Sequence, residues 1–280
     1  MSPERYFVGL SYNNYERKII IYDSNSMETV NTNLSNLSKL RVHIAPVGFE
    51  IDRVVIPAKI ERADKVWLLI HDKPHEDKAS SYRETIVKEL KKLNVKVEIA
   101  QADRMDLFKT IKAVKEIVQQ EKKNDIYVNV ASGSKIQAIA CMMACMIFNN
   151  QNNIKPFYAE AEKYAAFEGK QQSIGWKRNI ALPSYEIQIP KHELVTALKI
   201  IKEKGGKISK KEMAKLAEDA KIITVGAREE NFEQARFASL DKNIIQPLAD
   251  QWKFIEVEKV GRNRWIKITE AGSQAAEFLI

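Results

Sequence analysis

The chain has 280 residues, of which 45% are hydrophobic and 29% are charged, a composition that excludes a disordered or fibrous protein. This length exceeds the roughly 100 to 150 residues of a common single core, so we expect two domains. No run of about 18 apolar residues occurs, and the N-terminus lacks the basic and apolar regions of a secretory signal. The sequence therefore predicts a cytoplasmic protein without a membrane span.

The formal net charge is +8, with 45 Lys and Arg against 37 Asp and Glu, which favours an anionic partner. The segment after residue 180 contributes little to this excess, because it contains 17 basic and 15 acidic residues. The two cysteines, Cys141 and Cys145, stand four residues apart in a predicted helix, a spacing that suits reduced thiols. No histidine lies near them in the sequence, so we expect no metal site and no resident cofactor.

The first domain follows a segment rich in Ser and Asn, which we expect to form a poorly ordered leader over residues 1–40. From residue 41, five apolar strand-like runs recur at regular spacing, and amphipathic segments follow the first four. This alternation is typical of βαβ units, so we predict an α/β domain over residues 41–180, a Rossmann-like parallel sheet with helices on both faces. The helices are expected at 50–63, 80–93, 103–122 and 135–148, the third with Asp103 as its N-cap.

The second domain follows LPSYEIQIPKH, a stretch with two prolines that predicts a linker over residues 181–190. Over residues 191–280 we expect three helices, then two alternating strands around Gly261-Arg262-Asn263, then a last helix from Glu270 to Leu279. Three helices followed by a two-stranded hairpin predict a winged helix-turn-helix.

The turn after the fourth strand, Ala131 to Lys135, reads ASGSK and opens the apolar helix at 135–148. A small-residue turn before a helix directs several backbone N–H groups to one place, which suits an anion. The serines would add hydroxyls and Lys135 a cation. A chain also uses Ser-Gly-Ser merely to cap a helix, and that alternative stays open.

The turn after the first strand, APVGF at residues 45–49, is also small and tightly bent. In a sheet with strand order 3-2-1-4-5, ligands bind at the carboxyl ends of strands one and four, where the order reverses. The two turns are therefore expected to form one site. The spacing fits neither a P-loop nor a G-x-G-x-x-G fingerprint, which argues against ATP with magnesium and against NAD.

The stretches VHIAPVGFEIDRVV and VNVASGSKIQAIA together resemble the CRISPR-associated Rossmann fold (CARF) sensor domains. The likeness is specifically to archaeal CARF-like proteins with a C-terminal winged helix, which are regarded as transcriptional regulators. It implies a homodimer that binds a cyclic oligoadenylate between its protomers with the loops after strands one and four. Many CARF domains have Gly-Gly-Thr in the second loop, so the departure here bears on the identity of the ligand. The residues implicated by position are Pro46, Val47, Gly48, Phe49, Ser132, Gly133, Ser134 and Lys135.

The helix at 135–148 is apolar nearly all round. Its small alanines and its methionines suit close packing against a second copy, and they suit equally a helix buried inside one copy. Both interpretations stay open.

The winged helix is expected to lay its third helix in the major groove of double-stranded DNA while the wing contacts the backbone. Pro247 interrupts that third helix and predicts a kink or a change of pitch. In the wing, basic residues occur from Lys259 to Lys267 without an acidic residue between them, as phosphate contact requires. The DNA-binding residues predicted are Lys210, Lys211, Lys242, Asn243, Gln246, Arg262, Asn263 and Arg264.

An enzyme is the alternative function class. The cluster from His71 to Asp77 has no second ligand set, and no nucleophile elbow occurs in the sequence. We therefore expect a ligand-responsive DNA-binding transcriptional regulator rather than an enzyme. Two alternatives stay open, namely slow ring-nuclease cleavage of a bound cyclic oligoadenylate and a sensor whose winged helix binds protein.

Overall fold

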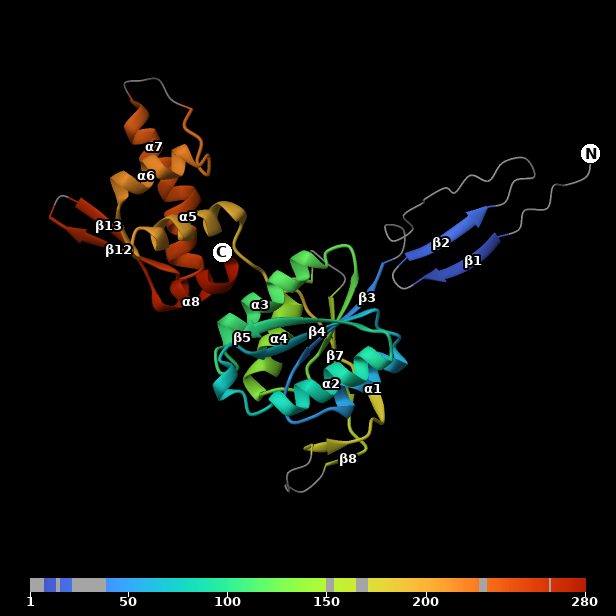
Figure 1. Cartoon of the computed structure of the whole chain (residues 1–280). Helices are drawn as coiled ribbons and strands as arrows, with labels where there is room; N and C mark the ends of the chain where they lie inside the picture. Colours follow the sequence, from blue (N-terminus) through green and yellow to red (C-terminus); the bar gives the residue numbers. More distant parts are fainter. Residues whose placement is uncertain are drawn as a thin grey trace, which may run out of the picture.

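The computed structural model describes residues 8–13, 16–21, 39–149, 154–164, 171–226, 231–261 and 263–280 (Figure 1). A six-stranded sheet in the order β10-β7-β6-β3-β4-β5 forms the centre of the first domain. Five of its strands are parallel, and they confirm the order 3-2-1-4-5 that the sequence analysis used to locate the site. The strands are β3 (Arg41–Pro46), β4 (Lys65–His71), β5 (Lys96–Ala102), β6 (Asp125–Asn129), β7 (Ile154–Glu160) and the antiparallel edge strand β10 (Arg178–Ala181).

Helices cover both faces of this sheet, as predicted. The helices α1 (Asp52–Ile60) and α2 (Ser80–Lys92) pack on one face, where Leu68 of β4 is buried. The helices α3 (Leu107–Gln120) and α4 (Lys135–Ile147) pack on the other face, where the adjacent Leu69 is buried. Because successive strand side chains point to opposite faces, an unbroken apolar run such as VWLLI fills both cores.

The N-cap of α3 differs from the prediction. Asp106, not Asp103, caps the helix, and its Oδ1 accepts from the Lys109 N–H at 3.0 Å. Asp103 instead accepts from the Met105 N–H at 2.9 Å and so closes a short turn before the helix. Both aspartates satisfy backbone donors, but the tertiary path of the chain decides where the helical hydrogen bonds begin.

The second domain contains α5 (His192–Glu203), β11 (Lys207–Ser209), α6 (Lys210–Asp219) and α7 (Phe232–Leu240), then β12 (Ile255–Val260), β13 (Asn263–Ile268) and α8 (Glu270–Leu279). The strands form a small sheet in the order β11-β13-β12. The third helix continues from α7 as two π-helical segments, Asp241–Ile245 and Pro247–Gln251. The change of pitch predicted at Pro247 is confirmed, because proline has no N–H for an α-helical bond and the wider π turns accommodate it.

Several elements were not predicted. Within the expected leader, β1 (Val8–Asn13) pairs with β2 (Glu16–Ile21) in an antiparallel hairpin, and the rest of residues 1–38 lies outside the described residues. After β7, β8 (Lys163–Tyr164) pairs with β9 (Ser173–Ile174). These pairings join short segments whose partners the local pattern does not reveal. Among the described residues, no helix is long and apolar enough to cross a membrane.

Candidate ligand site and nucleic-acid interface

The loops after β3 and β6 meet at the carboxyl edge of the sheet, as the topology requires of adjacent parallel strands. The Ser132 hydroxyl donates to the Pro46 carbonyl at 2.7 Å. A Cβ on Gly48 would lie 2.9 Å from the backbone nitrogen of Gly133, so the two loops touch backbone to backbone. Gly133 has φ +81°, which favours glycine. Two stretches far apart in the sequence thus form one surface, with Pro46, Val47, Gly48 and Ser132 buried within it.

The serine hydroxyls have a structural role, and for Ser134 it includes the helix cap that the sequence left open as an alternative. Ser134 forms a capping box with Gln137, whose N–H donates to Ser134 Oγ at 3.1 Å and whose side chain accepts from the Ser134 N–H at 3.0 Å. The Ser134 hydroxyl also donates to the Arg104 carbonyl at 2.9 Å. The serines therefore hold the loop to its neighbours, and the groups left for a ligand are the exposed Lys135 and the half-buried Phe49 and Gly133.

The β8–β9 hairpin supports the loop after β3 from the outside. Gln171 accepts from the backbone N–H groups of Ile51 and Asp52 at 2.9 and 3.2 Å. Asp52 in turn accepts from the Gly175 N–H at 2.8 Å, and the Gln172 N–H donates to the Phe49 carbonyl at 2.8 Å. The hairpin is therefore part of the site's framework, although no local sequence signal indicated it.

The winged helix presents most of the predicted DNA-binding side chains to solvent. Lys242, Asn243 and Gln246 are exposed on the π-helical part of the third helix, and Asn243 donates to Ser239 Oγ at 3.1 Å. On the other elements, Lys211 of α6 and Asn263 and Arg264 of β13 are also exposed. A groove of about 400 Å³ lies between the third helix and the wing, with Gln246 and Arg264 among its lining residues. Arg262 lies outside the described residues.

Lys210 is held by contacts within the winged helix domain. Its ammonium lies 2.6 Å from the Asp241 carboxylate and 5.6 Å from the centre of the Phe237 ring, and its side chain is only 13% exposed. A lysine held in this way joins α6 to the third helix and has little freedom to reach a phosphate. The structure therefore gives Lys210 a structural role, and its contact with DNA stays a prediction.

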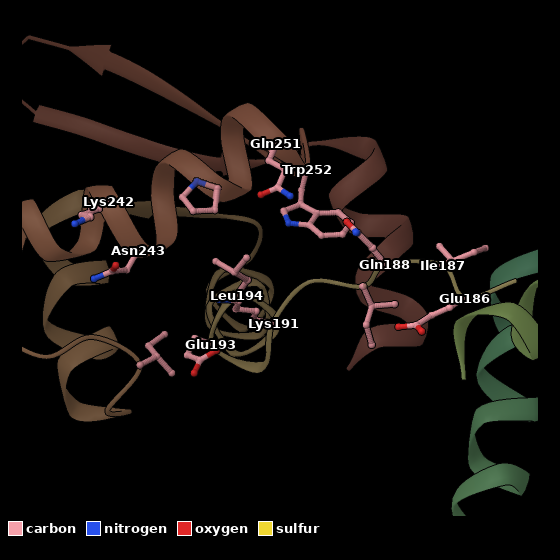
Figure 2. Close-up of a pocket in the computed structure, with 13 residues that line it drawn as sticks. Glu186, Ile187, Gln188, Lys191, Glu193, Leu194, Lys242, Asn243, Gln251 and Trp252 are labelled. Carbon is pink, nitrogen blue, oxygen red and sulfur yellow. The ribbon is translucent and has the colours of Figure 1, made fainter. Parts of the chain in front are cut away.

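A larger cavity of about 670 Å³ lies between the linker and the winged helix (Figure 2). Its apolar wall includes Leu194 and Trp252, while Lys242 and Asn243 line it from the third helix. Lys242 and Asn243 thus face the linker side of the third helix, whereas Gln246 faces the wing.

The winged helix also packs on the first domain (Figure 1). The rings of Phe108 on α3 and Phe278 on α8 stack with centroids 6.2 Å apart, and Lys115 donates to the Leu279 carbonyl at 2.9 Å. Burial lowers the pKa of Lys115, as expected for an ammonium enclosed between two domains. At the end of α4, the Ile187 N–H of the linker donates to the Met146 carbonyl at 3.1 Å.

The helix α4 shows features of both interpretations that the sequence left open. Cys141, Ala144 and Cys145 are buried against the sheet, and burial raises the pKa of the Cys141 thiol to about 12, so both cysteines are protonated at neutral pH. On the outer face, however, Ile139 is 52% exposed and Met142 is half-buried. In the part of the chain that the structure describes, no group of three or more His, Cys, Asp or Glu side chains could hold a metal ion.

Two family models match separate parts of the chain. Residues 193–280 match a family model described as the DUF6293 C-terminal winged helix domain. The C-terminal part of the chain is a winged helix domain. Residues 41–164 match a model described as HFX_2341_N:-like, N-terminal.

A relative in Methanocaldococcus jannaschii, the uncharacterized protein MJ1513, is 30% identical over 200 residues. The match covers 62% of this chain, and the chain spans about 60% of the length of that relative. Among solved structures, Enterococcus italicus Csm6 bound to cyclic hexa-2'-fluoro-hexa-dAMP has a TM-score of 0.38 at 14% identity, with 45% of this chain and 34% of that chain covered. Can2 from Sulfobacillus thermosulfidooxidans in complex with cyclic tetra-adenylate has a TM-score of 0.38 at 15% identity, with 81% of this chain and 57% of that chain covered.

Proposed function

We propose that this chain is a DNA-binding transcriptional regulator that responds to an anionic nucleotide, a cyclic oligoadenylate or a related second messenger. The observation that carries the proposal is the connection, within one chain, of a winged helix domain to α3, whose preceding loop is hydrogen-bonded to the loop after β6. Ser134 contacts the Arg104 carbonyl, and Phe108, four residues further on, stacks on Phe278 of the winged helix. A ligand that moves the β6–α4 loop would therefore act on α3 and through it on α8.

The chemical class of the effector is inferred from the groups at the carboxyl edge of the sheet, where the two loops meet. Lys135 supplies an exposed cation at the start of α4, where the helix dipole also favours negative charge. Gly48 and Gly133 allow the two loops to touch backbone to backbone, which places Lys135 and the half-buried Phe49 on one surface for a ligand. A phosphodiester meets these conditions, and the likeness of both loops to CARF sensors favours a cyclic oligoadenylate.

The proposed regulator acts as a homodimer, because a two-fold protein suits a palindromic operator with half-sites about one helical turn apart. The outer face of α4 suits the interface. Ile139 is 52% exposed there, and Ile187 of the linker, hydrogen-bonded through its N–H to α4, is 40% exposed. Apolar side chains that remain exposed on neighbouring elements favour contact with a second copy.

The hydrogen bonds of the two loop serines also favour a regulator over an enzyme. The hydroxyls of Ser132 and Ser134 both donate to main-chain carbonyls, which leaves neither proton ready for transfer to a base. Incubation of the protein with cyclic oligoadenylates, followed by chromatography, tests this point. Linear products formed at a rate proportional to protein concentration would establish the ring-nuclease alternative.

The decisive experiment measures the thermal unfolding of the protein with cyclic tri-, tetra- and hexa-adenylate and with common nucleotides. We expect one ligand to raise Tm, because a ligand that binds only the folded state stabilises it, and we expect Lys135→Ala to reduce the shift. Lys122→Ala, which changes an exposed lysine beyond the C-terminal end of α3, is the matched control. If no nucleotide raises Tm of the wild-type protein, the proposed effector class is wrong.

DNA binding is tested separately with fluorescent duplexes, first of random sequence and then of selected sequence. Arg262→Ala with Arg264→Ala should abolish binding and leave the nucleotide-induced rise in Tm unchanged. Retention of full DNA affinity in this double variant would contradict the role of the wing and favour a winged helix that binds protein.

A further inference from the structure

A buried polar cluster lies beside the candidate site, at the carboxyl end of β7. Arg53, on the first turn of α1, is only 3% exposed, and its partner Glu50 is 6% exposed. Two tyrosines, Tyr158 of β7 and Tyr164 of β8, complete the cluster. The loop contacts described above use none of these side chains.

The guanidinium of Arg53 is incompletely paired. Its Nε donates to the Ala159 carbonyl at 2.7 Å, and its Nη1 lies 3.0 Å from both carboxylate oxygens of Glu50. The Nη2 group is buried, yet none of the described residues accepts a hydrogen bond from it. A buried N–H without an acceptor is unfavourable, so Nη2 indicates a position for an oxygen atom that the chain itself does not supply.

The tyrosines form the outer layer of the cluster. The guanidinium carbon of Arg53 lies 4.8 Å from the centre of the Tyr158 ring and 5.9 Å from that of Tyr164. The two phenol oxygens are 3.2 Å apart, and Tyr164 is 62% exposed. Because Tyr164 is both close to the guanidinium and open to solvent, rotation of this one side chain would open a path to Arg53.

Glu50 is a weak competitor for an incoming anion. Burial raises the pKa of its carboxyl group, while the charge of Arg53 and the hydrogen bonds from Arg53 lower it less. The protein therefore holds this carboxylate at a cost in desolvation, and the singly charged phosphate of a phosphodiester can interact with the guanidinium through the free Nη2 group.

The cluster is connected to both loops of the candidate site. Glu50 follows Gly48 by two residues, and the side-chain amide of Asn129, the last residue of β6, donates to the Arg53 carbonyl at 2.7 Å. The same Asn129 accepts from the Ala131 N–H of the second loop at 2.9 Å. The cluster is thus the neighbour of both loops, and a ligand bound across the loops would meet the cluster with the part that extends beyond them.

We propose that Arg53 and Tyr164 form a further subsite, in which Arg53 Nη2 donates to a phosphate oxygen of the nucleotide and the Tyr164 ring stacks on a base. This subsite rests on the proposed function, since it requires a nucleotide at the edge of the sheet. Arginine suits the role because its fork donates to phosphate oxygens while Nη1 keeps its own partner.

The test is the affinity, by titration calorimetry, of cyclic tri-, tetra- and hexa-adenylate for the full-length protein and its variants. Tyr164→Ala should lower the affinity for the nucleotide that binds by about five-fold or more, as loss of one base-stacking contact does. Tyr164→Phe keeps the ring, so its affinity should stay within about two-fold of the wild-type value. Ile174→Ala, an exposed change on the partner strand β9, is the control for damage to the hairpin and should bind as the wild type does.

Arg53→Lys examines the phosphate contact. A lysine can keep one ionic contact with Glu50 but has no second nitrogen to donate outward, so we expect at least a ten-fold loss of affinity. Loss of the Nε bond to the Ala159 carbonyl should also lower the Tm of the free protein. If this variant unfolds, Tyr164→Ala alone decides the matter. Wild-type affinity in Tyr164→Ala together with a loss in Lys135→Ala overturns the subsite and leaves the proposed function intact, with Nη2 served by a buried water. Absence of binding by the wild-type protein overturns both.

Discussion

The ring of Phe108 on α3 stacks on the ring of Phe278 on α8 with an interplanar angle of 6°, and this contact joins the winged helix to the first domain. Phe278 packs against the same core that contains Ile111 and Cys141. The winged helix domain is thus held to the sheet through its last helix as well as through the linker. Since α3 starts three residues after Arg104, whose carbonyl Ser134 binds, the contact lies close to the candidate site.

Phe278→Ala should loosen this contact between the domains, because it removes the stacked ring while the core of the winged helix keeps its own side chains. We expect faster amide hydrogen exchange in α3, measured by mass spectrometry, and faster proteolysis in the linker over residues 181–190. The matched control is Phe254→Ala, since Phe254 packs beside Trp252 within the winged helix. Equal exchange in α3 for both variants would contradict the role of Phe278.

Gly48→Ala should separate the two loops of the candidate site. A methyl group there would lie 2.9 Å from the Gly133 nitrogen, and because the atoms that it meets belong to the backbone, they cannot easily move away. We expect a loss of about 1–3 kcal/mol in the free energy of unfolding, measured with urea, and weaker nucleotide binding. Gly226→Ala is the control, because nothing lies within 4 Å of a Cβ at that position.

His43 should make the protein less stable in mild acid. Burial, and to a smaller extent the charge of Arg41, lowers the pKa of His43 from 6.5 to about 4. Between these two pKa values the unfolded chain binds a proton that the folded chain does not. The free energy of unfolding therefore has its full value above pH 6.5 and decreases as the pH falls toward 4. The total decrease expected in the free energy of unfolding is about 3 kcal/mol.

The measurement compares urea unfolding at pH 7 and near pH 4.5 for the wild type and for His43→Phe. The ring of His43 lies between Tyr127 and Phe157, so phenylalanine fits the surroundings without a titrating group. The variant should lose less stability in acid than the wild type. The same pH dependence in both proteins would show that carboxylates alone account for the loss.

Ile139→Glu should shift the proposed homodimer toward monomer, because it places a charge on the exposed face of α4. Sedimentation at several protein concentrations measures the change, and we expect at least a ten-fold rise in the dimer dissociation constant. Ile60→Glu, on α1, is the matched control, since Ile60 is 47% exposed against 52% for Ile139. A monomeric wild-type protein at micromolar concentration, with and without DNA, would contradict the dimer.

Arg264→Ala should weaken DNA binding at all sequences and lower the slope of log affinity against log salt concentration by about 1, as loss of one phosphate contact does. Lys207→Ala is the comparison, because Lys207 lies 3.0 Å from the Glu258 carboxylate and is already partnered. Fluorescence anisotropy over a range of salt concentrations measures both slopes. An unchanged slope for Arg264→Ala would remove this residue from the interface.

The order of the elements was predictable from the sequence because it depends on local patterns. Apolar runs such as VWLLI in β4 must be buried on both faces, and their alternation with amphipathic helices leaves few topologies. The wing was predictable because alternating strands flank a short turn at Gly261. The pitch change at Pro247 follows from the chemistry of one residue. All of these features depend on residues close together in the chain.

The tertiary structure alone decided the partners of the polar groups. Ser132 and Ser134 bind carbonyls of Pro46 and Arg104, which lie 86 and 30 residues away in the sequence. Lys210 is bound by Asp241 in the same way, although its position on α6 suggested a DNA contact. A serine or a lysine in a sequence shows what it can donate but not which acceptor the folded chain brings to it. The site was therefore located by topology, whereas the side chains free to serve a ligand were determined by long-range packing.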